Sequence, residues 1–244
     1  MKKTLILTVI LVLSFSGLSL AQTYNYSIEG GFVYTTLDSD FLDEVVETAN
    51  NFYQNELEYY QNDPNYDIEV DEFNKIDEFD SATGFWIGLQ NDLGNYKLGT
   101  NYELFSEEVE GNIYARDLNT GDYIKADDSL EIEVEGIYVD LEKPITEYFS
   151  ISAGIGSYSG EIKSEEKIEE RVSGTVSRYN FSGGVDLERD FGFKIGISSN
   201  YPLTENLSLL GDLNYRKLEL DIEDSNESID FDGLELKAGL TYKF

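Results

Sequence analysis

The stretch Gly233-Leu234-Glu235-Leu236-Lys237-Ala238-Gly239-Leu240-Thr241-Tyr242-Lys243-Phe244 decides the fold class. Its even-numbered residues are all apolar or aromatic, and its odd-numbered residues are glycine, polar or charged. A period of two is typical of a β-strand, because successive side chains point to opposite faces of a sheet. The stretch therefore predicts a strand with one apolar and one polar face.

The same alternation recurs seven times upstream, which predicts eight strands. The connections alternate in length. The short ones cover 91–95, 142–148 and 201–206, and the long ones cover 37–80, 106–129, 160–190 and 221–230. Short turns on one side and long loops on the other are typical of an up-and-down antiparallel meander, in which an even strand number brings both chain ends to the short-turn side. The apolar parity flips near Glu135-Gly136 and Lys217-Leu218, which suggests β-bulges.

Two of the short turns repeat each other. Residues 144–151 read Pro-Ile-Thr-Glu-Tyr-Phe-Ser-Ile, and residues 202–209 read Pro-Leu-Thr-Glu-Asn-Leu-Ser-Leu. We interpret the pair as a repeated hairpin element, in which proline at a strand end removes no ladder hydrogen bond.

The first long loop, 37–80, contains the one helical pattern. From Phe41 to Tyr60 the apolar residues follow helical spacing, Asp40 is placed to cap the start, and Pro64 closes the end. A helix on a membrane surface would carry Lys and Arg on its polar face, whereas this polar face is acidic. We expect it to pack on the rim of its own barrel or on a partner.

Composition excludes several functions. Among 244 residues there is no His and no Cys, so triads with His, thiol nucleophiles, Cys/His zinc sites, disulfides and His-ligated haem are all absent, and no cofactor is expected. The formal charge of −32 argues against nucleic acid as a partner, because phosphate is repelled.

Residues 1–21 have the pattern of a cleaved secretory signal peptide. Lys2 and Lys3 precede an apolar run from Leu5 to Leu13, and Ser19-Leu20-Ala21 fits the rule for the cleavage site. We expect the mature chain to be residues 22–244. The alternative, an uncleaved anchor, has an apolar run that is short for a membrane span.

Alternation alone does not say which face meets water. In a soluble β-sandwich the apolar parity faces a core, and in a transmembrane barrel it faces lipid. The barrel is favoured because the polar parity is rich in Gly and Ser, as crowding inside a small barrel requires, and because aromatic residues gather near strand ends. Closure also removes exposed strand edges. We predict an all-β fold, an eight-stranded antiparallel up-and-down transmembrane barrel with a short helical insertion in its first long loop.

With these features the chain resembles the small eight-stranded outer-membrane barrels of diderm bacteria, the OmpX/OmpA-type group. The resemblance rests on the signal peptide, the meander and the terminal Leu240-x-Tyr242-x-Phe244. It implies outer-membrane lipid as the surrounding partner and the barrel assembly machinery as a transient partner that reads Leu240, Tyr242 and Phe244. It implies no catalytic residue, since the enzymes among outer-membrane barrels use His. The helical insertion departs from the short loops usual in the group.

The polar parity places charges of both signs in the lumen. The expected set is Glu29, Lys97, Glu103, Asp140, Lys194, Asp212, Glu235 and Lys237, with Arg216 as a further candidate. A barrel of eight strands has room only for side chains or a very small ligand, so we expect ion pairs that plug the lumen. An open ion path is the functional alternative, and a catalytic carboxylate pair is the remotest reading.

The excess acid lies mostly in the long loops. We interpret it as a solvated face, with a weak Ca²⁺ or Mg²⁺ site as the sharper alternative and a high-salt habitat as another source of acidity. The predicted function is a non-enzymatic outer-membrane barrel with a structural or surface-interaction role. The alternatives are a small cation-preferring pore and a secreted soluble β-barrel that binds an apolar ligand.

Overall fold

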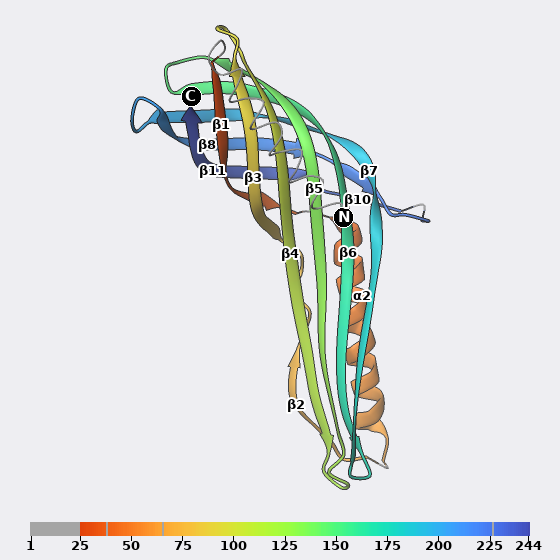
Figure 1. Cartoon of the computed structure of the whole chain (residues 1–244). Helices are drawn as coiled ribbons and strands as arrows, with labels where there is room; N and C mark the ends of the chain where they lie inside the picture. Colours follow the sequence, from red (N-terminus) through yellow and green to blue (C-terminus); the bar gives the residue numbers. More distant parts are fainter. Residues whose placement is uncertain (1–24, 38, 65, 226) are drawn as a thin grey trace.

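The computed structural model describes residues 25–37, 39–64, 66–225 and 227–244 (Figure 1). The signal peptide expected at 1–21 lies outside the described residues. The described elements are β1 (Tyr26–Thr36), α2 (Asp40–Asn62), β2 (Ile68–Asn74), β3 (Ser81–Asp92), β4 (Lys97–Asp117), β5 (Tyr123–Pro144), β6 (Phe149–Val172), β7 (Thr175–Pro202), β8 (Leu207–Lys217), β9 (Glu219–Asp221), β10 (Ser228–Asp230) and β11 (Gly233–Lys243).

Eight of these strands form a closed antiparallel ring. Its order is β1-β3-β4-β5-β6-β7-β8-β11, and it closes where β1 pairs with β11 from Ser27↔Lys243 to Thr35↔Glu235. Closure leaves no edge strand within the ring. The eight-stranded meander predicted from the alternation is confirmed.

The ring is apolar outside and polar inside. On β7, Phe193 and Ile195 are 58% and 66% exposed, while Lys194 between them is buried. The same contrast on β11 sets exposed Leu236 against buried Glu235 and Lys237. A soluble barrel would reverse this arrangement, so the outer belt is the surface that faces lipid. No helix among the described residues is long and apolar enough to cross a membrane.

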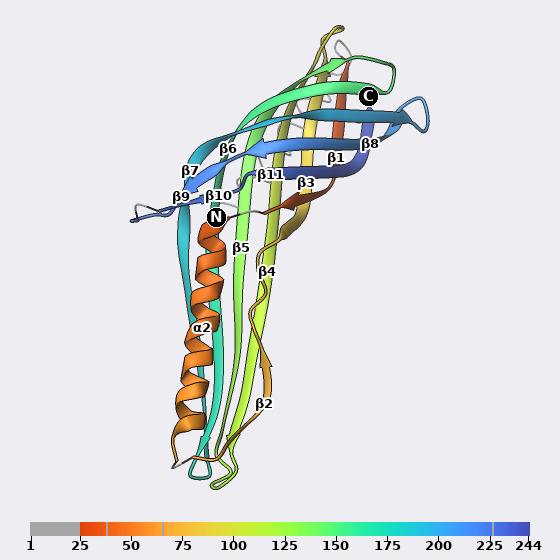
Figure 2. The same ribbon diagram turned by 180° about the vertical axis from the view of Figure 1, so that it is seen from behind.

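The expected long loops at 106–129 and 160–190 are not loops, which corrects the sequence interpretation. Strands β4, β5, β6 and β7 run for 21, 22, 24 and 28 residues and continue far beyond the ring (Figures 1 and 2). We call residues 106–117, 123–134, 160–172 and 175–188 of these strands, together with β2 paired to β4, the protruding sheet.

Where the strands leave the belt, the apolar side chains change face. On β5, Ile137 and Val139 point outward and are exposed, whereas Ile132 and Val134 point inward and are 1% exposed. The flip at Glu135-Gly136 therefore needs no bulge, and the pairing of β5 with both neighbours is continuous there. The register shift lies between Tyr158 and Gly160 in the β6–β7 pairing. The flip at Lys217-Leu218 marks the end of β8.

Helix α2 covers the inner face of the protruding sheet, the face continuous with the lumen (Figure 2). Leu42 and Val46 are 2% exposed and belong to the apolar core with Ile76, Phe79 and Val109. The helix ends before Pro64, as predicted, but its N-cap is Ser39 and not Asp40, which is the first helical residue. The helix contacts β10 at the barrel mouth and β2 of the protruding sheet, so the expected contact with the rim is present beside the contact with the sheet.

The two repeated turns have the same hydrogen bonds. The Thr146 hydroxyl accepts from the backbone N–H groups of Tyr148 and Phe149, and the Thr204 hydroxyl accepts from those of Asn206 and Leu207. The predicted hairpin repeat is thus a repeat of structure as well as of sequence.

Candidate functional site

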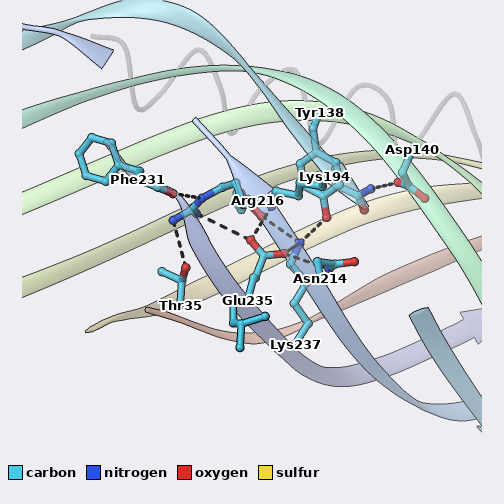
Figure 3. Close-up of polar contacts among 12 residues, drawn as sticks. Thr35, Tyr138, Asp140, Lys194, Asn214, Arg216, Phe231, Glu235 and Lys237 are labelled. Atoms are coloured by element: carbon cyan, nitrogen blue, oxygen red, sulfur yellow. Dashed lines mark hydrogen bonds and ion pairs between the residues drawn. The ribbon is translucent and has the colours of Figure 1, made fainter. Parts of the chain in front are cut away.

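The lumen contains a buried ionic network of five charged residues, which we call the knot: Glu103, Lys194, Arg216, Glu235 and Lys237. The Lys194 ammonium lies 2.5 Å from Glu103 Oε1 and 2.6 Å from Glu235 Oε2. The Lys237 ammonium lies 2.9 Å from Glu103 Oε2 and 3.3 Å from Glu235 Oε1. Each ammonium therefore bridges the same two carboxylates, of which Glu235 is labelled with both lysines in Figure 3.

The knot residues come from the three neighbouring strands β7, β8 and β11 and from β4 across the ring. Glu103 is on β4, Lys194 on β7, Arg216 on β8, and Glu235 and Lys237 on β11. All five point inward because they share the polar parity of their strands. Glu103, Arg216 and Glu235 are 0% exposed, so bulk solvent does not reach their side chains.

Arg216 joins the knot to the outer mouth. Its Nε donates to the Phe231 carbonyl at 3.0 Å, and its Nη2 donates to the Thr35 hydroxyl at 3.0 Å (Figure 3). The guanidinium carbon lies 4.3 Å from the centroid of the Phe105 ring, a cation–π contact. Its Nη1 is 3.8 Å from Glu235 Oε2.

Aromatic side chains complete the seal around the two lysines. Lys237 donates a hydrogen bond to the Tyr138 hydroxyl, and Lys194 and Lys237 both lie 4.4 Å from the centroid of the Tyr138 ring. Trp86 lies 5.3 Å from the Lys237 ammonium. The side chain of Tyr158 needs space, which Gly136 supplies: a Cβ there would lie 2.1 Å from the Tyr158 ring.

A second, apolar barrier lies outside the knot. The hairpin of β9 and β10 folds against the barrel mouth, and its apolar residues are almost completely buried. They are Leu218, Leu220, Ile229 and Phe231, each at 0–1% exposure. The lumen therefore contains the charged knot, and a small apolar lid lies at its mouth on the side of the protruding sheet.

Between the knot and the short turns lies a group of four carboxylates, Glu29, Asp140, Glu142 and Asp212. The Lys97 ammonium is 3.8 Å from Glu142, and Asn101 donates to Asp140 at 2.5 Å. Glu29 Oε2 and Asp212 Oδ1 have no hydrogen-bond partner among the described residues. The cavity that they line measures about 20 Å³, room for about one water molecule.

The residues expected in the lumen thus fall into two groups. Glu103, Lys194, Glu235 and Lys237 come together in the knot, with Arg216. Glu29, Asp140 and Asp212 lie in the acidic group, with Lys97 beside it. The sequence interpretation missed Tyr138 and Glu142. Both share the parity of Asp140 on β5, but Glu142 had been placed in the following turn.

The expected assembly signal lies on the lipid-facing side of β11. Leu240, Tyr242 and Phe244 are 48%, 44% and 46% exposed, and the rings of Tyr242 and Phe244 meet edge to face at 5.4 Å. Nothing in this geometry tests recognition by an assembly machinery, which stays a prediction.

On the protruding sheet, polar contacts fix α2 in place. Asn50 donates to the Ile76 carbonyl at 3.0 Å and accepts from the Ile76 N–H at 2.9 Å. The Tyr53 hydroxyl donates to Glu166 at 3.1 Å. Burial raises the pKa of Tyr53, with Asp128 and Glu166 beside it adding to the effect. Burial likewise raises the pKa of Asp128.

A cleft of about 970 Å³ lies between α2, residues 75–80 and β4. Eight carboxylates and one lysine line it: Asp43, Glu47, Asp77, Glu78, Asp80, Glu107, Glu108 and Glu110, with Lys75. In the part of the chain that the structure describes, no group of three or more His, Cys, Asp and Glu residues is arranged to hold a metal ion. The weak Ca²⁺ or Mg²⁺ site expected at the acidic loops gains no support from this geometry.

No family model matches the chain, and no curated protein matches it. Solved structures do match. The attachment invasion locus protein Ail of Yersinia pestis is 11% identical, with 91% of this chain and 99% of Ail covered and a TM-score of 0.44. Neisserial surface protein A is 12% identical, with 90% and 97% covered and a TM-score of 0.41. The outer-membrane protease OmpT of Escherichia coli is 12% identical, with 90% and 97% covered and a TM-score of 0.32. The names of the three proteins refer to attachment and invasion, to a surface and to proteolysis.

Proposed function

We propose that the protein is a non-enzymatic outer-membrane barrel that presents its protruding sheet to macromolecules outside the cell. The observation that carries the proposal is the division of the molecule into two parts. The ring is closed by the knot and the lid, while β4–β7 continue as one sheet braced by α2 (Figure 1). A sealed lumen passes no substrate. The large sheet beyond the membrane belt is therefore the part of the protein available to contact other molecules.

The route by which the chain reaches the outer membrane is part of the same proposal. A signal over 1–21 would direct secretion, and the terminal Leu240, Tyr242 and Phe244 would be read by the barrel assembly machinery before insertion into outer-membrane lipid. The short turns then lie in the periplasm, and the protruding sheet lies outside.

Site-specific photo-crosslinking on intact cells tests the proposal. A photo-crosslinking amino acid at Lys167, which is exposed on the outer face of β6, should form adducts with externally added macromolecules. The same amino acid at Lys143, exposed at the short-turn end, is the matched control and should form none. Adducts at neither position, or at Lys143 alone, would contradict the proposed orientation and role.

A further inference from the structure

The protruding sheet has two edges, which differ in their protection. The β2 edge is only seven residues long, is interrupted by a register shift between Val70 and Glu72, and carries Glu69, Asp71 and Glu72. Short length, irregularity and charge are the features by which sheets prevent other strands from pairing. The β2 edge is therefore closed to a further strand.

The β7 edge is longer, has no irregularity and carries a single charge. From Thr175 to Val185 the described residues give β7 no neighbour on the side away from β6, because pairing with β8 begins only at Phe193 and a single bridge joins Leu187 to Ile222. These eleven residues pair with β6 without interruption, and Arg178 is the one charged residue among them. No acidic residue lies among them, although the chain has a net charge of −32.

The turn geometry shows which backbone groups are free. Ser173 and Gly174 have φ of 52° and 81°, which makes a two-residue hairpin turn closed by Val172 and Thr175. Alternation in an antiparallel pair then directs the N–H and C=O groups of odd-numbered β7 residues to β6 and those of even-numbered residues outward. The carbonyl of Asp186, an even-numbered residue, accepts from the Glu223 N–H at 3.0 Å on this outward side.

The apolar side chains of this edge are partly exposed, so a bound strand could cover them. Tyr179, Phe181 and Val185 share the inner face and are 44%, 55% and 43% exposed. The rings of Tyr179 and Phe181 are stacked, with 6.5 Å between centroids. An added strand would bury part of this apolar surface while it satisfied the outward backbone groups.

Charge distinguishes between two candidate partners for this edge, a second copy of the chain and a cationic segment. Helix α2, which lies along the same part of the sheet, has six acidic residues and no Lys or Arg (Figure 2). A second copy of the chain would bring a like charge of −32 to the contact and be repelled. A cationic partner would be attracted by the same field.

We propose that the free edge of β7, Thr175 to Val185, binds an extended cationic segment of a partner protein as an additional strand. This inference rests on the proposed function, because it names the part of the protruding sheet that makes contact. The outward groups of Val176, Arg178, Asn180, Ser182 and Gly184 would form the ladder, and Tyr179 and Phe181 would receive the apolar side chains of the partner.

The test uses a fluorescent peptide of alternating lysine and valine, as long as the free edge, and the full-length mature protein in lipid nanodiscs. Fluorescence anisotropy should show binding, and Ser182→Pro should weaken it by at least about tenfold. Proline removes the outward N–H of Ser182 without removing a bond to β6, and edge strands tolerate it. Ser182→Ala, which keeps the N–H, is the matched control and should bind as the natural chain does.

Two further peptides keep the test decisive if Ser182→Pro fails to fold. A peptide N-methylated at alternate residues lacks the ladder donors and should bind at least about tenfold more weakly, and a glutamate–valine peptide should not bind. Absence of binding by the lysine–valine peptide, or equal binding by the N-methylated one, would overturn the inference. Self-association that Ser182→Pro abolishes would overturn it in favour of a second copy. If Lys167 crosslinks survive these failures, another face of the protruding sheet makes the contact, and the proposed function stands.

Discussion

At the scale of residues, burying the charges of the knot costs free energy, so the knot favours the one strand register in which its charges are paired. Taking five charges out of water carries a large desolvation penalty, which is offset only when every charge is paired at short distance. The bridging of Glu103 and Glu235 by two ammonium groups meets this requirement for four of the five charges, and the Arg216 guanidinium lies 3.8 Å from Glu235. Because Glu103 on β4 meets Lys194 on β7 and Lys237 on β11 across the ring, the network requires the correct strand register.

Removing one knot carboxylate should destabilise the barrel strongly. Glu235→Ala leaves Lys194, Lys237 and Arg216 with a single buried carboxylate, so we expect a loss of about 3–5 kcal/mol in the free energy of unfolding. Trp86, the single tryptophan, is buried beside Lys237 and reports urea unfolding by its emission. Glu108→Ala, at an exposed carboxylate of the protruding sheet, should change the free energy of unfolding by less than about 0.5 kcal/mol. Equal effects of the two variants would refute the role of the knot.

The fit of Tyr158 against Gly136 gives a second prediction. Gly136→Ala places a methyl group 2.1 Å from the ring and should cost about 1–3 kcal/mol of unfolding free energy. The cost should shrink in the Tyr158→Leu background, because the two residues are in contact. Gly211→Ala, whose Cβ would meet nothing closer than 4.0 Å, is the control. Additive costs in the double variant would show that the two residues do not compete for the same space.

At the scale of elements, the sequence interpretation did not recognise that the strands of the ring continue beyond the membrane. The strands of the ring were recognised by their outward apolar residues, and Leu98, Tyr102 and Leu104 of β4 have even numbers. After Phe105 the apolar residues Val109, Ile113 and Ala115 have odd numbers. The outside changes from lipid to water at that level, so the buried face becomes the apolar one and the strand continues. The alternation was present in the sequence, but the acidic residues between were taken as loop.

The repeated turns should contribute equally to stability. Thr146→Val and Thr204→Val each remove an acceptor used by two backbone N–H groups, so each should cost about 1 kcal/mol. Serine at either position keeps the hydroxyl and should cost less. The two turns share no residue, and the costs should add in the double variant when urea unfolding is measured. A large effect at one turn and none at the other would contradict a structural repeat.

The docking of α2 should weaken as pH rises. Burial raises the pKa of Asp128, so the folded chain binds a proton there at a pH where the unfolded chain has released it. The resulting stability is fully present below the ordinary Asp pKa of about 4 and is lost as pH rises through the raised value. Hydrogen exchange of α2 amides, corrected for the intrinsic pH dependence, should show more protection at mildly acidic pH than at neutral pH.

Asp128→Asn should remove most of this pH dependence, and its amide oxygen can still accept a hydrogen bond from the Tyr53 hydroxyl as the Asp128 carboxylate does. Asp127→Asn is the matched control, because Asp127 lies on the opposite face of β5 and pairs with Lys125 at 2.7 Å. If protection of α2 falls on acidification, or if Asp127→Asn abolishes the effect as well, the assignment to Asp128 is wrong.

At the scale of the whole molecule, the closed ring could be predicted and the arrangement outside it could not. A period of two fixes which residues face in and out, and alternating connection lengths fix the order of neighbouring strands. The position of α2 depends on Leu42, Val46 and Asn50 meeting residues of the 75–80 segment and β4, which no local pattern encodes. The pairing of charges within the knot likewise depends on register across the ring. The sequence therefore predicted that these charges lie in the lumen but did not predict which of them are in contact.

Conductance in a planar lipid bilayer tests the central claim most directly. The refolded mature protein should insert stably and give no conductance steps, because the knot and the β9–β10 lid close the lumen in series. An Asp212→Asn variant, measured beside it, should be equally silent. Reproducible cation-selective steps that Asp212→Asn alters would contradict the sealed barrel and establish a pore through the acidic group.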